Sequence, residues 1–294
     1  MTIRDARWDG RPVPGRATPF DHPVMASHVR RLGPLLLALS LIVGLAPTVG
    51  ATDGSVDQAA MNVAEQHALE LTNARRAAHG LIDLRLDSRL TQLARERAQY
   101  MADTGEFSHV QSNGTSVFDM IEASGMTWYA AGEIIAWNTA GPLDYSAQFA
   151  VQGWMGSPSH RAIVLSDDYN YVGFGLAVAS NGTRYWAGVY LRGPDRTGSW
   201  THMGTYSRTI LDKTYARVTI RWTGGDTRLQ VLTSGLRYFQ AERRRDGGVW
   251  YDYGTTTAHY LTARWLRGHT YEFRVRSRDR RGNWSGWVYR TIVP

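Results

Sequence analysis

The spacing of apolar residues changes once along this 294-residue chain, near residue 171. Before that point, apolar side chains recur every three to four residues, as in helices that bury one face. The helical segments expected from this spacing cover residues 66–80, 87–105, 116–125 and 143–157. After it, the stretch YVGFGLAVASNGTRYWAGVYL contains two strand-like runs joined by a Ser-Asn-Gly-Thr turn. Helices followed by a short antiparallel sheet predict an α+β fold.

The predicted helices carry capping signals and a core face. Asp87 or Ser88 can cap the second helix, and Gly105 can end it. The face of this helix expected to be buried holds Leu90, Leu93, Ala94, Ala98 and Met101. In the fourth helix, we expect Phe149 and Trp154 to anchor the core.

The sign of the charge reverses near residue 204. Residues 52–204 carry 10 basic and 16 acidic side chains, whereas residues 205–294 carry 17 basic and 7 acidic side chains. The second region shows no helical spacing, and its five to seven short runs of β-branched and aromatic residues predict a small all-β sandwich. We therefore expect two domains, at residues 64–192 and 207–294, joined by a linker at 193–206.

The amino terminus has the pattern of an export signal. Arg30 and Arg31 precede a 12-residue largely apolar run, residues 35–46, which is too short to span a bilayer. Small residues follow at 49–51, so we predict a signal peptide over 1–51, with Met25 as an alternative start of translation, and a short linker over 52–63. The mature chain is then secreted, with no transmembrane span. The absence of cysteine excludes thiol catalysis, cysteine metal ligands and disulfide bonds.

His160 lies in the stretch GWMGSPSHRAIVL, residues 153–165. Ser157 can cap a helix there, and Pro158 suits the first helical position. His160 then falls in the first turn, where the helix dipole favours neutral imidazole, the form that binds a metal or accepts a proton. A surface or capping histidine is the alternative at this position.

Two further polar residues call for partners. His109 follows the end of a predicted helix, and Glu133 lies among small and apolar residues in AGEIIA. A carboxylate in such a context needs an ion pair or hydrogen bonds. Two histidines and one acid can form a site for zinc or another divalent cation, and they can equally form a structural hydrogen-bond network.

Five blocks of this sequence resemble, in order, a bacterial member of the CAP (or SCP) superfamily. The blocks are LTNARRAAHGL, FSH, AGEIIA, GWMGSPSHRAIVL and YVGFGLAV…YWAGVYL. The superfamily is named for cysteine-rich secretory, antigen 5 and pathogenesis-related proteins. The resemblance covers roughly residues 64–192 and implies a secreted α-β-α sandwich. It also implies a cleft with two histidines and two acids that in some members bind a divalent cation. His109, Glu133 and His160 match three of these four positions, and the fourth acid is missing after Trp154.

Residues 207–294 resemble a fibronectin type III domain, in which Trp222 would be the core tryptophan and Tyr271 would take the corner position. Arg274, Arg276 and Arg278 alternate along one predicted strand, and Trp284 and Trp287 follow. These five side chains can form a cation–π ladder. The ladder is either a binding patch for an anionic cell-wall polymer or glycan, or a stabilising stack on the strand surface. Specific nucleic-acid binding is not expected.

Three function classes follow. The first is a non-enzymatic extracellular binding protein, with a small ligand, a lipid or a divalent cation in the cleft and the basic domain as a tether. The second is a metal-dependent hydrolase with Glu133 as the base, the catalytic residues otherwise being unknown. The third is a structural adhesion protein. A serine nucleophile at Ser157 lacks the expected flanking glycines, and nothing suggests that Asp144 approaches Glu133 as a glycosidase pair.

Overall fold

The computed structural model describes residues 57–294. The predicted signal peptide and the possible start at Met25 lie outside these residues. The first helix, α1 (Gln58–Ala77), begins within the range expected for a short linker, because the Asp57 side chain accepts a hydrogen bond from the backbone N–H of Ala59 and caps it.

The remaining helices are α2 (Ser88–Thr104), α3 (Val117–Ala123), α4 (Leu143–Gly156) and α5 (Pro158–Val164). Asp87 caps α2, and Gly105 ends it in the left-handed conformation, as expected from the sequence. Ser157 occupies the N-cap position of α5, but its hydroxyl makes no capping bond and lies 3.3 Å from the Ser159 hydroxyl. The sequence prediction of a side-chain cap at Ser157 is therefore wrong.

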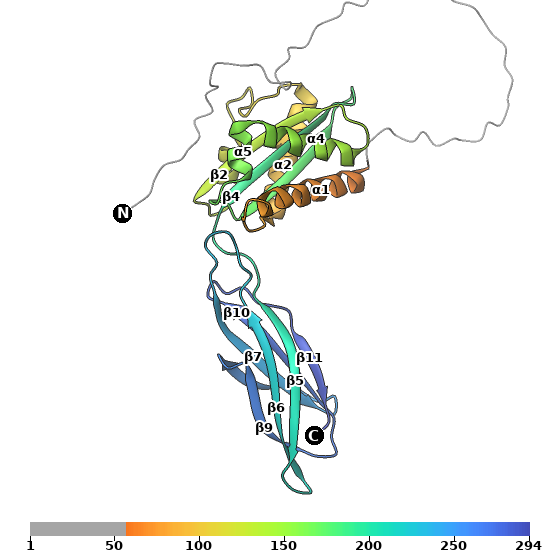
Figure 1. Cartoon of the computed structure of the whole chain (residues 1–294), viewed down its shortest axis with the longest axis vertical. Helices are drawn as coiled ribbons and strands as arrows, with labels where there is room; N and C mark the ends of the chain where they lie inside the picture. Colours follow the sequence, from red (N-terminus) through yellow and green to blue (C-terminus); the bar gives the residue numbers. More distant parts are fainter. Residues whose placement is uncertain (1–56) are drawn as a thin grey trace, which may run out of the picture.

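A four-stranded sheet lies between two helical layers (Figure 1). Its strands are β1 (Arg85–Leu86), β2 (Ala130–Asn138), β3 (Tyr171–Val178) and β4 (Arg184–Arg192), in the order β1-β3-β4-β2. Helices α1, α4 and α5 pack on one face, and α2 and α3 pack on the other. This arrangement confirms the α+β prediction and leaves β2 at an edge of the sheet.

Of the two core residues predicted in α4, one is buried and the other is exposed. Trp154 is buried, stacks on Phe174 and donates its indole N–H to the Ile135 carbonyl at 3.0 Å. Phe149 is 53% exposed, so its prediction as a core residue is wrong. The buried face of α4 instead carries Ala147, Ala150 and Val151, whose small side chains let the helix approach α1.

The second unit consists of two antiparallel sheets around a common core. One holds β5 (Trp200–Ile210), β6 (Tyr215–Gly225) and β9 (Tyr260–Leu266). The other holds β7 (Leu236–Arg245), β8 (Tyr251–Thr256), β10 (Tyr271–Asp279) and β11 (Val288–Ile292). Trp222 is buried between Phe239 and Phe273, as predicted. Strand β5 begins inside the range expected for the linker, at residues 193–206.

The two units touch through the loop between β6 and β7, residues 226–235. Leu229 in this loop is 2% exposed and belongs to the core on the α2 face of the first unit. The backbone N–H of Ile82 donates to Gln230 Oε1 at 2.7 Å, and Asn170 Nδ2 donates to the Val231 carbonyl at 3.3 Å. The second unit is thus attached by packing as well as by the chain.

Close approach of α2 to β3 depends on glycine. A Cβ at Gly175 would lie 2.2 Å from the Ala94 carbonyl carbon.

We expect Gly175→Ala to lower the free energy of unfolding by about 3 kcal/mol, because backbone atoms cannot move aside as a side chain can. Chemical denaturation measures this change. Gly141→Ala is the control, since its Cβ would meet nothing within 4 Å; an equal loss in both variants would contradict the explanation.

Candidate functional site

The structure brings His109, Glu133 and His160 together from three different elements. Glu133 lies on the edge strand β2 and is 5% exposed. His109 follows the end of α2, and His160 lies in the first turn of α5. The two imidazole rings are 6.3 Å apart between their centroids.

Glu133 accepts hydrogen bonds on both oxygens. Arg97 Nε donates to Oε1 at 2.8 Å, and His109 Nδ1 is paired with Oε2, also at 2.8 Å. Arg97 comes from α2, is fully buried, and also donates from Nη2 to the Ser108 carbonyl at 2.5 Å. One arginine therefore fixes both the carboxylate and the backbone beside His109.

Arg97 was missed by sequence reasoning. Its signal is an arginine on the apolar face of α2, between Leu93 and Met101. A buried arginine at such a position requires an acidic partner. The helix itself offers none on that face, which points to an acid from another element.

His160 is held neutral. Burial is the main cause that lowers its pKa from 6.5 to about 4, and the neighbouring His109 lowers it further, while Glu133 opposes the shift. The sequence prediction of neutral imidazole agrees with this direction, although burial rather than the helix terminus is the main reason. At neutral pH the ring can accept a proton, a hydrogen bond or a metal ion.

A cavity of about 960 Å³ opens beside these residues. Apolar side chains such as Phe118, Ile163 and Tyr169 form part of its wall, together with His109, Glu133 and His160. Two acids that the sequence did not suggest, Asp119 and Glu122 of α3, also line it. A cavity of this size with a few polar groups is typical of a small-molecule site.

Whether the cavity could hold a metal ion depends on which atoms of His109, Glu133 and His160 are available as ligands. Both Glu133 oxygens already accept hydrogen bonds from Arg97 and His109, so the carboxylate orients the His109 ring. Carboxylates that hold a histidine in this way are frequent next to metal ions. The nitrogen donors that fit a cation are the imidazoles of His109 and His160.

Asp144 does not join the cleft. It lies on α4, where its Oδ1 is 3.7 Å from His67 Nδ1, and it does not line the cavity. A glycosidase pair of Glu133 and Asp144 has no support in this geometry.

Comparisons with known proteins show a family similarity in the segment that carries this site. Residues 69–190 match the family model of the cysteine-rich secretory proteins, named CAP. These residues form a CAP-like domain of the chain. It includes His109, Glu133 and His160, as the resemblance in the sequence implied. Within residues 57–294, no helix is both long and apolar enough to cross a membrane.

Two curated relatives share 35% identity with the CAP domain region. They are the uncharacterized protein YkwD and the uncharacterized membrane protein YlbC, both of Bacillus subtilis (strain 168). Each match covers 38% of this chain, and the chain spans 41% of YkwD and 31% of YlbC. A solved extracellular protein containing an SCP domain, from Bacillus anthracis str. Ames, is 26% identical with a TM-score of 0.39, over 47% of this chain and 45% of its own.

The predicted cation–π ladder is present outside the CAP domain. Arg276 lies between the rings of Trp284 and Trp287, at 3.9 and 4.3 Å from their centroids. Arg278 stacks on Trp284, and Arg274 stacks on Trp287 and on Trp250, which the sequence did not suggest. Arg274 also pairs with Glu242, so part of the positive charge of the ladder is neutralised within the domain.

Removal of Arg97 tests its structural role. We expect Arg97→Met to lower the free energy of unfolding by about 3–5 kcal/mol, because Glu133 would stay buried without its cation. Urea denaturation measures the change. Arg89→Gln on the same helix removes a half-exposed ion pair with Asp87 and should change stability by no more than about 1 kcal/mol. Similar losses in the two variants would show that the buried pair has no special role.

The pKa of His160 predicts a pH dependence of stability. The unfolded chain binds a proton at this ring below about pH 6.5, whereas the folded chain does so only near pH 4. Stability should therefore be complete above pH 6.5 and fall by up to about 3 kcal/mol as the pH drops from 6.5 to 4. Denaturation curves across this range, made in a chelator, should show a smaller decrease for His160→Asn than for the unmodified protein. Parallel curves for the two proteins would contradict the expectation.

Proposed function

We propose that this chain is an exported binding protein whose CAP domain holds a small ligand in the cavity beside His109, Glu133 and His160. The observation that carries the proposal is the pairing of a large, partly apolar cavity with a neutral His160 on its wall. The apolar part suits a lipid-like or other hydrophobic body, and the imidazoles suit a polar end or a cation. The signal-like pattern at residues 1–51 supports export.

A divalent cation such as zinc would be held by His109 and His160. When bound, such an ion supplies a Lewis acid to a ligand oxygen. Glu133 would fix the tautomer and orientation of His109 through its bond to Nδ1, leaving Nε2 for the ion. Arg97 would hold the Glu133 carboxylate in place through its hydrogen bond to Oε1.

Binding is favoured over metal-dependent hydrolysis. A general base must reach a water or substrate proton. Glu133 is buried, and Arg97 and His109 already occupy its two oxygens. The same arrangement that holds the cleft residues in place therefore removes the candidate base from the reaction. A purely structural adhesion role would leave the cavity without a purpose.

The second unit is proposed to act as a fibronectin type III-like tether for an anionic cell-wall polymer or glycan. The Tyr271 hydroxyl accepts a hydrogen bond from the backbone N–H of Leu266 at 3.2 Å, a contact that supports the corner assignment. A pocket of about 520 Å³ is lined by Arg243, Arg245 and Arg264 with aromatic rings and no carboxylate. This pocket could take an anionic ligand through Arg243 and Arg245, since Arg264 is already paired with Asp212.

Zinc titration by calorimetry tests the cleft. We expect binding of about one equivalent to the purified protein, loss of binding in His160→Ala, and affinity about 10- to 100-fold weaker in Glu133→Gln. His79→Ala is the control, because His79 is exposed and bonded to its own helix. Zinc affinity unchanged by His160→Ala, or no binding at all, would remove the cation from the proposal and leave the cavity to an organic ligand.

A further inference from the structure

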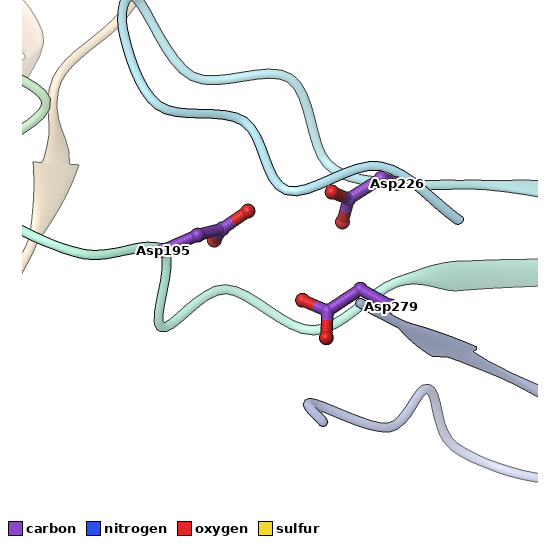
Figure 2. A group of neighbouring side chains, drawn as sticks. All are labelled: Asp195, Asp226 and Asp279. Atoms are coloured by element: carbon purple, nitrogen blue, oxygen red, sulfur yellow. The ribbon is translucent and has the colours of Figure 1, made fainter. Parts of the chain in front are cut away.

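Three aspartates meet where the two units join. Asp195 lies in the segment that leaves β4, Asp226 follows β6, and Asp279 ends β10. Their carboxylates face a common space (Figure 2), and one oxygen of each lies within 4.8 Å of the others. Asp195 is 4% exposed and Asp279 is completely buried.

No cationic side chain balances this group. Among the ion pairs formed within residues 57–294, none involves Asp195, Asp226 or Asp279. Arg196, the nearest arginine in sequence to Asp195, pairs instead with Asp87 of the first unit. Three carboxylates at this separation repel one another, most strongly at the buried Asp195 and Asp279, whereas Asp226 is partly exposed.

The hydrogen bonds of the group orient the carboxylates but leave one buried oxygen without a partner. Asp195 accepts from Thr197 and Ser234, and Asp279 accepts from the backbone and side chain of Asn283. Asp226 Oδ2 accepts from Ser234 and Gly235. Asp226 Oδ1 is buried and has no hydrogen-bond partner, although a buried polar atom ordinarily has one.

The spacing and the donor type identify the missing partner. Ligand oxygens lie about 2.3–2.6 Å from Ca²⁺, so oxygens on one ion can be up to about 5 Å apart. The separation of 4.8 Å or less is compatible with a single ion among the three carboxylates. Calcium takes oxygen ligands in flexible geometry, whereas Mg²⁺ requires shorter distances and a regular octahedron.

We propose that Asp195, Asp226 and Asp279 form a calcium site at the junction of the two units. The ion joins the segment that leaves the CAP domain to the ends of both β-sheets of the second unit. It also holds the start of the loop that carries Leu229 into the first core. The site shares no residue with the cavity of the CAP domain, so it is independent of the proposed function.

Calcium titration of the full-length protein after chelator treatment tests the site. We expect about one equivalent of Ca²⁺ to bind with a dissociation constant of about 0.1–1 mM, as in other extracellular modules, and Mg²⁺ to bind more weakly. Asp226→Asn should weaken calcium binding at least about tenfold, because one charged ligand is lost while the shape is kept. Asp103→Asn, which alters an exposed acid on α2, should bind as the unmodified protein does. His160→Ala should also keep calcium binding, which separates this site from the cleft.

Thermal unfolding gives a second test, in which calcium should reverse the order of the melting temperatures of the unmodified protein and Asp226→Asn. In chelator, Asp226→Asn should melt at a higher temperature than the unmodified protein, because one of three repelling charges is gone. With several millimolar Ca²⁺ the order should reverse, since only the unmodified protein gains stability from the ion. Failure of the unmodified protein to bind Ca²⁺, or equal calcium stabilisation of both proteins, would overturn the proposal.

Discussion

The buried contact between Arg97 and Glu133 is the interaction on which the cleft depends. It joins α2 to the edge strand β2 and also fixes the backbone at Ser108, so that one arginine positions His109 from two sides. A buried ion pair of this kind gives little net stability, but loss of either partner leaves a charge in the interior. The cost of breaking it keeps the cavity wall in one conformation.

The sequence predicts the elements of the fold well where one residue pattern determines one element. Asp87 and Gly105 mark the ends of α2, and the turn at residues 180–183 joins β3 to β4. Phe149 fails because helical spacing does not reveal which stripe faces the core when small residues make the contact. The sequence analysis did not predict strand β5 because most of its residues are exposed and they carry no alternating apolar pattern.

The candidate site was predictable in its three named residues and not in their support. His109, Glu133 and His160 are recognisable from sequence blocks in a fixed order, whereas Arg97 is visible only as an arginine on an apolar helix face. Asp119, Glu122 and the three junction aspartates come from segments far apart in the chain. Their proximity follows from how the elements pack, which no local pattern encodes.

The buried position of Leu229 changes what counts as the first domain. The family match ends at residue 190, yet part of the hydrophobic core on the α2 face is supplied by a loop that lies beyond it. The core of the CAP-like domain is therefore completed by a residue of its neighbour. Exchange of the β-domain for another module would remove Leu229 and uncover apolar surface on the α2 face.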